Sequence, residues 1–334
     1  MERFGVVVDI LPDNHMPYYK WLKCLPPGIL GRVKKSLGPR AIYPLDDMGW
    51  IISIPSFVEH KLPFDKILKT VKALEKLLDR LDIGRIHLGK IHNTINRQMA
   101  DILREKGRQV LTRSFIKEMA MLLYIIRIID KCGVDFAAQE IGIICRHKTR
   151  KRFMLYLLAG YSNYITGYEP KMWENQSLYD ELFNQLGLAV GTTQNIESIT
   201  NKCKIIILDT IPQRQYLEGI DQTKLVINLS GSNYTQGSPL NGLWVNDSFL
   251  KMPPDISTGM DESFAGLEHL VWECMLFDDR DFRTVYEAKE IQWEHIKKLV
   301  RVINDRGIDV EALHLNDKIL AHREVYRALA SIYK

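Results

Sequence analysis

The chain has 334 residues, of which 46% are hydrophobic and 26% are charged, and its formal net charge is +4. This composition is that of a globular protein, and the length is that of two domains. The positive charge is too weak to argue for nucleic-acid binding, and no aromatic residues alternate with the basic ones.

Targeting and redox signals favour a cytoplasmic protein. The N-terminus has too short an apolar run for a signal peptide. The longest apolar run, 119–129, contains Arg127 and falls short of a membrane span. The five cysteines form no CxxC pair, so the sequence predicts neither a zinc site nor a disulfide framework. We therefore expect no metal, no membrane span and a reducing location.

The first part of the chain predicts an N-terminal α/β domain. Short β-branched or apolar runs predict strands, and apolar residues at helical spacing predict helices between them. The expected strands are 4–10, 50–54 and 85–88, and the expected helices are 64–81, 96–106 and 115–132. The last helix is apolar on most sides, which suits a buried position and a homodimer interface equally.

The second part alternates more regularly between strands and helices. We expect strands at 141–145, 163–166, 188–190, 204–208 and 225–229, with helices or helical turns at 152–159, 176–186 and 196–201. Such alternation implies parallel pairing through right-handed crossovers. Two more helices are expected, from 263 to about 277 and from about 291 to 304. The expected fold class is therefore α/β, with an N-terminal α/β substrate-type domain at 1–135, a Rossmann-like domain with a parallel sheet at 136–262, and a C-terminal segment at 263–334 whose helices return to the first domain.

The segment Glu140–Gly160 has the form of a buried strand, a tight loop and a helix, which is the opening of a nucleotide-binding βαβ unit. Glycines in such a loop let the backbone approach a pyrophosphate, but here six of the seven positions from 146 to 152 are basic. Two interpretations follow: an anion site that uses charge and helix N–H groups, or a solvated basic turn. The candidate cofactor-binding residues of the loop are Arg146, Lys148, Thr149 and Arg150.

Other polar residues follow predicted strands at the edge where open α/β sheets bind ligands. Glu169 comes after strand 163–166, where an acidic residue bonds the adenine ribose hydroxyls in dinucleotide folds. Asp209 and Thr210 follow a second strand, and Gly231 follows a third. We expect these residues to line the ligand crevice, while capping or turn formation is the alternative for each of them.

Several short stretches resemble the long-chain acyl-[acyl-carrier-protein] reductases over roughly residues 80–310. They are Leu88-Gly89 at a strand end, the turn Leu111-Thr112-Arg113-Ser114, and the helix 264–273 with Glu268 and Glu273. The resemblance implies a two-domain plan shared with shikimate dehydrogenases, NADP or NAD as cofactor, and an acyl or other small-molecule substrate in the cleft between the domains. In that plan a lysine just past strand 85–88 can transfer protons, which makes Lys90 and His92 the candidate catalytic residues.

Three departures from the reductase pattern bear on activity. The glycine loop is replaced by the basic segment, Ala265 stands where the reductases have a cysteine nucleophile, and Arg113-Ser114 replaces a Gly-Asn pair. Because alanine cannot form a thioester, we consider two relocated nucleophiles, Cys145 beside cations that lower a thiol pKa and Cys274, with inert packing as the alternative.

The sequence therefore indicates a Rossmann-fold protein related to NAD(P)-dependent acyl reductases, with altered or lost oxidoreductase chemistry. The alternative is a non-catalytic protein that binds no cofactor and uses segment 146–152 for an acidic ligand or an acidic carrier protein.

Overall fold

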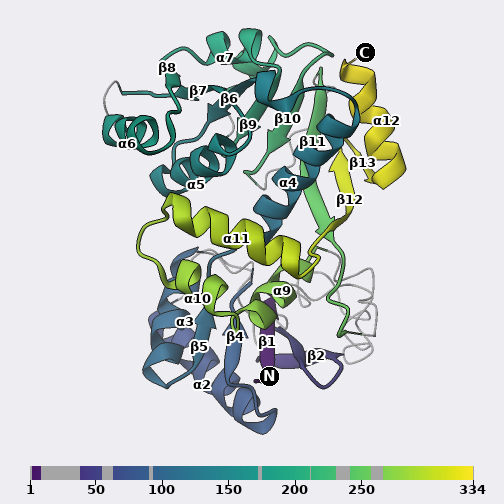
Figure 1. Cartoon of the computed structure of the whole chain (residues 1–334). Helices are drawn as coiled ribbons and strands as arrows, with labels where there is room; N and C mark the ends of the chain where they lie inside the picture. The colour runs from purple at the N-terminus through teal and green to yellow at the C-terminus, as the bar shows by residue number, and fades with distance from the viewer. Residues whose placement is uncertain are drawn as a thin grey trace. The chain divides into compact units, whose positions relative to one another are not determined.

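The computed structural model describes residues 2–8, 38–54, 63–89, 93–171, 175–210, 212–230, 241–256 and 266–333 (Figure 1). The chain forms two compact units, each with its own sheet. The first unit comprises Met1–Ser114 and Met252–Arg280, and the second comprises Phe115–Lys251 and Asp281–Lys334. Both units combine helices with mostly parallel sheets, so the expected α/β fold class is confirmed.

The first unit is built on a five-stranded sheet of order β2-β3-β1-β4-β5. Its strands are β1 (Phe4–Val8), β2 (Arg40–Leu45), β3 (Gly49–Ser53), β4 (Arg85–His87) and β5 (Gln109–Leu111). The pairings are parallel except at one edge, where β2 runs antiparallel to β3. All five residues of β1 are buried because both faces of the sheet are covered.

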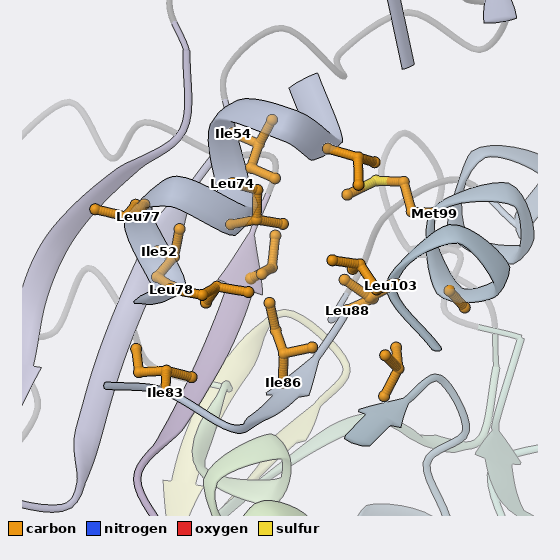
Figure 2. Close-up of a cluster of buried hydrophobic side chains, with 14 of the residues drawn as sticks. Ile52, Ile54, Leu74, Leu77, Leu78, Ile83, Ile86, Leu88, Met99 and Leu103 are labelled. Carbon is orange, nitrogen blue, oxygen red and sulfur yellow. The ribbon is translucent and has the colours of Figure 1, made fainter. Parts of the chain in front are cut away.

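Helices α2 (Phe64–Arg80) and α3 (Asn93–Glu105) cover one face of this sheet. The apolar residues of α2 recur at helical spacing, and Asp65 in its first turn and Arg80 in its last turn complement the helix dipole. Figure 2 shows the resulting cluster, in which Leu74 points toward side chains of the strands and of α3. The opposite face packs against α9 (Glu268–Leu276) through residues such as Val6 and Leu270.

The second unit is built on an eight-stranded sheet of order β13-β12-β11-β10-β9-β6-β7-β8. Its strands are β6 (Glu140–Ile144), β7 (Tyr164–Tyr168), β8 (Val190–Thr193), β9 (Ile205–Leu208), β10 (Leu225–Asn228), β11 (Leu243–Leu250), β12 (Val310–Leu315) and β13 (Lys318–Ala321). Strands β6 to β11 pair in parallel, and β12 and β13 are antiparallel additions at one edge. Read from β8 to β11, the parallel strands have the order 3-2-1-4-5-6, which is that of the doubly wound dinucleotide-binding fold.

The helices of the second unit connect and cover these strands. They are α4 (Ile116–Lys131), α5 (Lys148–Ala159), α6 (Gln176–Leu186), α7 (Ile196–Lys202), α8 (Arg214–Leu217), α11 (Trp293–Asp305) and α12 (His322–Tyr333), with a short 3₁₀ turn at Phe136–Ala138. Helix α10 (Arg280–Glu287) begins at the last residue of the first unit. Among the described residues, no helix combines the length and the apolar character needed to cross a membrane.

The fold departs from the expected elements in several places. The segment 263–334 contains strands β12 and β13 as well as helices, because β12 pairs with β11 and buries Val310, Leu313 and Leu315. The expected elements did not include strands β2 and β11 or helices α8, α10 and α12. Helix α4 lies in the second unit, where it packs against β11 and β12, whereas the expected N-terminal domain extended to residue 135.

We expect Leu74→Ala to destabilise the first unit by about 2–5 kcal/mol, because it removes a fully buried side chain and leaves a cavity. Leu81→Ala is the matched control, since Leu81 is only partly buried against the same cluster and should cost less. Urea unfolding followed by circular dichroism measures both variants. Equal losses of stability would contradict this description of the core.

Candidate functional site

The connection between β6 and α5 is shorter than the sequence pattern indicates. Strand β6 ends at Ile144 and α5 begins at Lys148, so residues 145–147 alone form the loop. The interpretation of 146–152 as a loop is therefore wrong, because residues 148–152 belong to the helix. Lysine and arginine are good helix formers, and neither glycine nor proline interrupts this segment.

The start of α5 has features that attract anions. Its N-cap residue, His147, makes no side-chain hydrogen bond to the first turn. Arg146, Lys148 and Thr149 are exposed around it. The amide groups of a helix start carry a partial positive charge, and the side chains of Arg146 and Lys148 add to it.

The next three residues are instead neutralised inside the second unit. Each forms ion pairs with carboxylates of the same unit, of which all but the exposed Glu290 are buried or partly buried: Arg150 with Glu118 and Asp209, Lys151 with Glu169, and Arg152 with Glu181 and Glu290. A helix that begins with several cations is disfavoured by its own dipole, and these carboxylates offset that repulsion. Burial lowers the pKa of Arg150, but Glu118 and Asp209 outweigh burial and raise this pKa above its ordinary value.

Glu169 directly follows β7, the strand-end position at which dinucleotide folds carry their ribose-binding acid. Its side chain is buried and accepts hydrogen bonds from Lys151 Nζ at 2.5 Å, from Asn175 Nδ2 at 2.9 Å and from the Tyr179 hydroxyl. Burial and the bond to Glu169 raise the pKa of Tyr179, so its phenol remains a donor. The carboxylate is thus committed to internal donors, and its ribose-binding role stays a prediction.

Asp209 directly follows β9 and is also buried. Its carboxylate accepts from Arg150, and Cys145 Sγ donates to Oδ2 at 3.2 Å. Burial, followed by the negative charge of Asp209, raises the pKa of the Cys145 thiol. The hypothesis of a thiolate activated by neighbouring cations is therefore wrong. Burial likewise raises the pKa of Cys274, whose side chain is fully buried.

The structure brings some of the predicted site residues together and separates others. Arg150 meets Asp209, with the half-buried Thr210 next in the chain, while Glu169 belongs to a separate group around Lys151. Lys90, His92, Gly231 and Ala265 lie outside the described residues, so the roles assigned to these positions stay predictions.

A cavity of about 350 Å³ opens beside the start of α5. It is lined by Lys148, Thr149, Arg152, Lys289, Glu290 and Ile291. Lys289, which lies between α10 and α11, was not among the expected site residues, because no motif marks it as a spatial neighbour of Lys148. Cationic side chains beside a helix start suit a small anion such as a phosphate group.

No family model matches this chain, and no curated protein matches it. Solved structures give distant matches. Δ(1)-Pyrroline-2-carboxylate reductase of Thermococcus litoralis, in complex with NADH and L-proline, is 16% identical, with 33% of this chain and 35% of that chain covered and a TM-score of 0.25. Phosphoglycerate oxidoreductase of Vibrio cholerae is 11% identical, with 68% and 75% covered and a TM-score of 0.28. Anabolic ornithine carbamoyltransferase of Campylobacter jejuni is 7% identical, with 92% and 88% covered and a TM-score of 0.36.

This chain thus spans about a third of the reductase and most of the other two proteins. Matches at these TM-scores assign neither family nor activity. The comparison with nucleotide-binding folds rests on the strand order of the second unit itself.

The buried pair of Lys151 and Glu169 gives a test of stability. We expect Lys151→Met to cost about 3–5 kcal/mol, because it leaves the carboxylate buried without its counter-charge. The double variant with Glu169→Gln should cost less than the sum of the single variants. Lys297→Ala, which removes an exposed pair with Glu294, serves as the control without a measurable effect. Additive losses in denaturant unfolding would show that the two side chains are not coupled.

Thiol alkylation tests the electrostatics at Cys145. Burial and Asp209 raise the pKa of this buried thiol, whereas Cys132 is half-buried and only burial raises its pKa. We therefore expect Cys145 to be protected at pH 7 to 9 and Cys132 to react faster as the pH rises. Iodoacetamide labelling and peptide mass spectrometry should detect Cys132 in the folded protein and Cys145 after unfolding in urea. Labelling of Cys145 at the rate of Cys132 in the folded protein would contradict this expectation.

Proposed function

We propose that the second unit uses the frame of a nucleotide-binding fold to hold a small anionic ligand by side-chain charge, and that its oxidoreductase chemistry is altered or lost. The observation that carries this proposal is that neighbouring side chains at the start of α5 differ in their contacts. Lys148 and Thr149 line a cavity, while Arg150 and Lys151 are held by Asp209 and Glu169.

The two ion pairs stand where a dinucleotide would make its contacts. A pyrophosphate needs close approach to the backbone between β6 and α5, and the loop of Cys145, Arg146 and His147 offers no glycine for that approach. An adenine ribose would need the carboxylate of Glu169, which already accepts from three internal donors. Dinucleotide binding in the usual manner would therefore have to break a buried ion pair, which is costly.

The resemblance of residues 80–310 to acyl-carrier-protein reductases agrees with this proposal. The resemblance implies that related reductases bind NADP at a glycine loop and use a cysteine nucleophile. This chain has basic side chains at the position of the loop and Ala265 at the position of the cysteine. The ligand of the cavity would then be a phosphate-bearing small molecule, or the phosphopantetheine of an acidic carrier protein, held by Lys148, which lines the cavity.

A second candidate function is NAD(P)-dependent reduction of a small-molecule or acyl substrate. Two observations favour it: the 3-2-1-4-5-6 order of the parallel strands, and the position of Glu169 directly after β7. In this case Glu169 would exchange Lys151 for the ribose hydroxyls when the cofactor binds.

Calorimetric titration with inorganic pyrophosphate, NADH and NADPH separates the two candidates. We expect pyrophosphate to bind and Lys148→Ala to lower its affinity about fivefold, because the variant loses one solvent-exposed charge contact of about 1 kcal/mol. Lys318→Ala, an exposed lysine on β13, is the control with unchanged affinity. We expect no saturable binding of either dinucleotide at millimolar concentration.

Each outcome decides between the proposals. If pyrophosphate does not bind, or binds equally well to the Lys148→Ala variant, the anion site at α5 is wrong. If NADPH binds saturably and Glu169→Gln weakens it, the second candidate replaces the first.

A further inference from the structure

The first unit carries a separate polar cluster at the carboxyl ends of β4 and β5. His87 is the last residue of β4, and Ser114 follows β5 after a short turn. Glu273 comes from α9, which packs against β1 and β4. The imidazole and the carboxylate are buried, with Glu273 fully buried, whereas Ser114 is exposed.

The hydrogen bonds of His87 define its tautomer. The backbone N–H of Gly89 donates to Nδ1 at 3.1 Å, so Nδ1 is an acceptor and the ring proton sits on Nε2. Nε2 lies 2.9 Å from Glu273 Oε2 and 3.3 Å from the carbonyl oxygen of Arg113. The chain needs glycine at position 89, because φ is +27° and a Cβ there would lie 2.1 Å from the carbonyl oxygen of Val7.

The second carboxylate oxygen of Glu273 faces the exposed hydroxyl. Ser114 Oγ donates to Glu273 Oε1 at 2.9 Å. An activated nucleophile donates a hydrogen bond to a base, and a third group holds that base in place. Ser114, Glu273 and His87 have this arrangement. Here the base is the carboxylate and the imidazole is the positioning group, an order that differs from the Ser-His-Asp arrangement.

The thiols near these sites do not compete for this role. Cys274, the neighbour of Glu273, is fully buried and its pKa is raised by burial. Cys145 is buried beside Asp209. An exposed hydroxyl with a base at hydrogen-bond distance is better placed to meet a substrate than either buried thiol.

We propose that Ser114 is a nucleophile that accepts an acyl group from an activated ester, with Glu273 as the general base and His87 as its positioning residue. Ser114 Oγ attacks the carbonyl carbon, the Oγ–C bond forms and the bond from carbon to the leaving group breaks. The serine proton passes to Glu273 Oε1 and then to the departing thiolate or aryloxide. A carboxylate is a weak base, so the substrate class is restricted to esters and thioesters with good leaving groups.

A fluorophosphonate probe tests this proposal without knowledge of the natural substrate. Ser114 Oγ forms a bond to phosphorus, the P–F bond breaks, fluoride leaves, and the serine proton passes through Glu273 to water. Peptide mass spectrometry should find the label on Ser114. Ser114→Ala should abolish labelling, and Glu273→Gln should slow it by about 100-fold, which is the contribution expected of a general base. Ser331→Ala, which removes an exposed hydroxyl bonded to a helix carbonyl, should label as the unchanged protein does.

Three further variants distinguish a loss of labelling from simple unfolding. Glu273→Asp keeps the buried negative charge but withdraws the carboxylate from Ser114, and it should also lose labelling. His87→Leu should reduce labelling, and His87→Gln should restore most of it, because glutamine can still donate to the carboxylate. Thermal melting shows whether each variant is folded. Absence of the label on Ser114, or an unchanged rate in a folded Glu273→Gln or Glu273→Asp variant, would overturn the proposal. Equal labelling by folded His87→Leu and His87→Gln would remove His87 from it.

Discussion

The buried ion pair of Lys151 and Glu169 joins the first turn of α5 to the end of β7. It belongs to a wider constraint, because a helix that starts with cations needs negative charge near its N-terminus. In dinucleotide folds a bound phosphate supplies that charge. Here carboxylates from α4, α6 and the ends of β7 and β9 supply it, and they fix α5 against its neighbours. These ion pairs place negative charge beside the first turn of α5 from within the second unit.

The two units use carboxylates in opposite ways. In the second unit, the carboxylates of Asp209 and Glu169 pair with cations, and each ion pair lies directly after the end of a strand. In the first unit, Glu273 accepts hydrogen bonds from His87 and Ser114, and these bonds orient its two oxygens. A carboxylate that is oriented beside an exposed hydroxyl can act as a general base, whereas a carboxylate that is paired with a buried lysine has a structural role. The candidate catalytic group and the candidate anion site therefore lie in different units.

The amino-acid sequence predicts the alternation of strands and helices in the second unit because each buried strand is a continuous apolar run between polar segments. It does not predict the ion pairs of α5, since Glu118 and Asp209 are remote from Arg150 in the chain and only the fold brings them together. The same reason hides the contact of Ser114 with Glu273. Lys90 and His92 were the catalytic candidates near the end of β4. The histidine that contacts Glu273 is His87, which the sequence pattern assigns to the strand itself.

We propose that two internal ion pairs occupy the positions where a dinucleotide fold binds its cofactor. A crystal structure of the protein grown in saturating NADPH tests this claim most directly. We predict that Lys151 remains bonded to Glu169 and Arg150 to Asp209, with no dinucleotide along the carboxyl edge of β6, β7 and β9. Electron density for NADPH at that edge, with Glu169 released from Lys151 and bonded to the ribose, would contradict the claim.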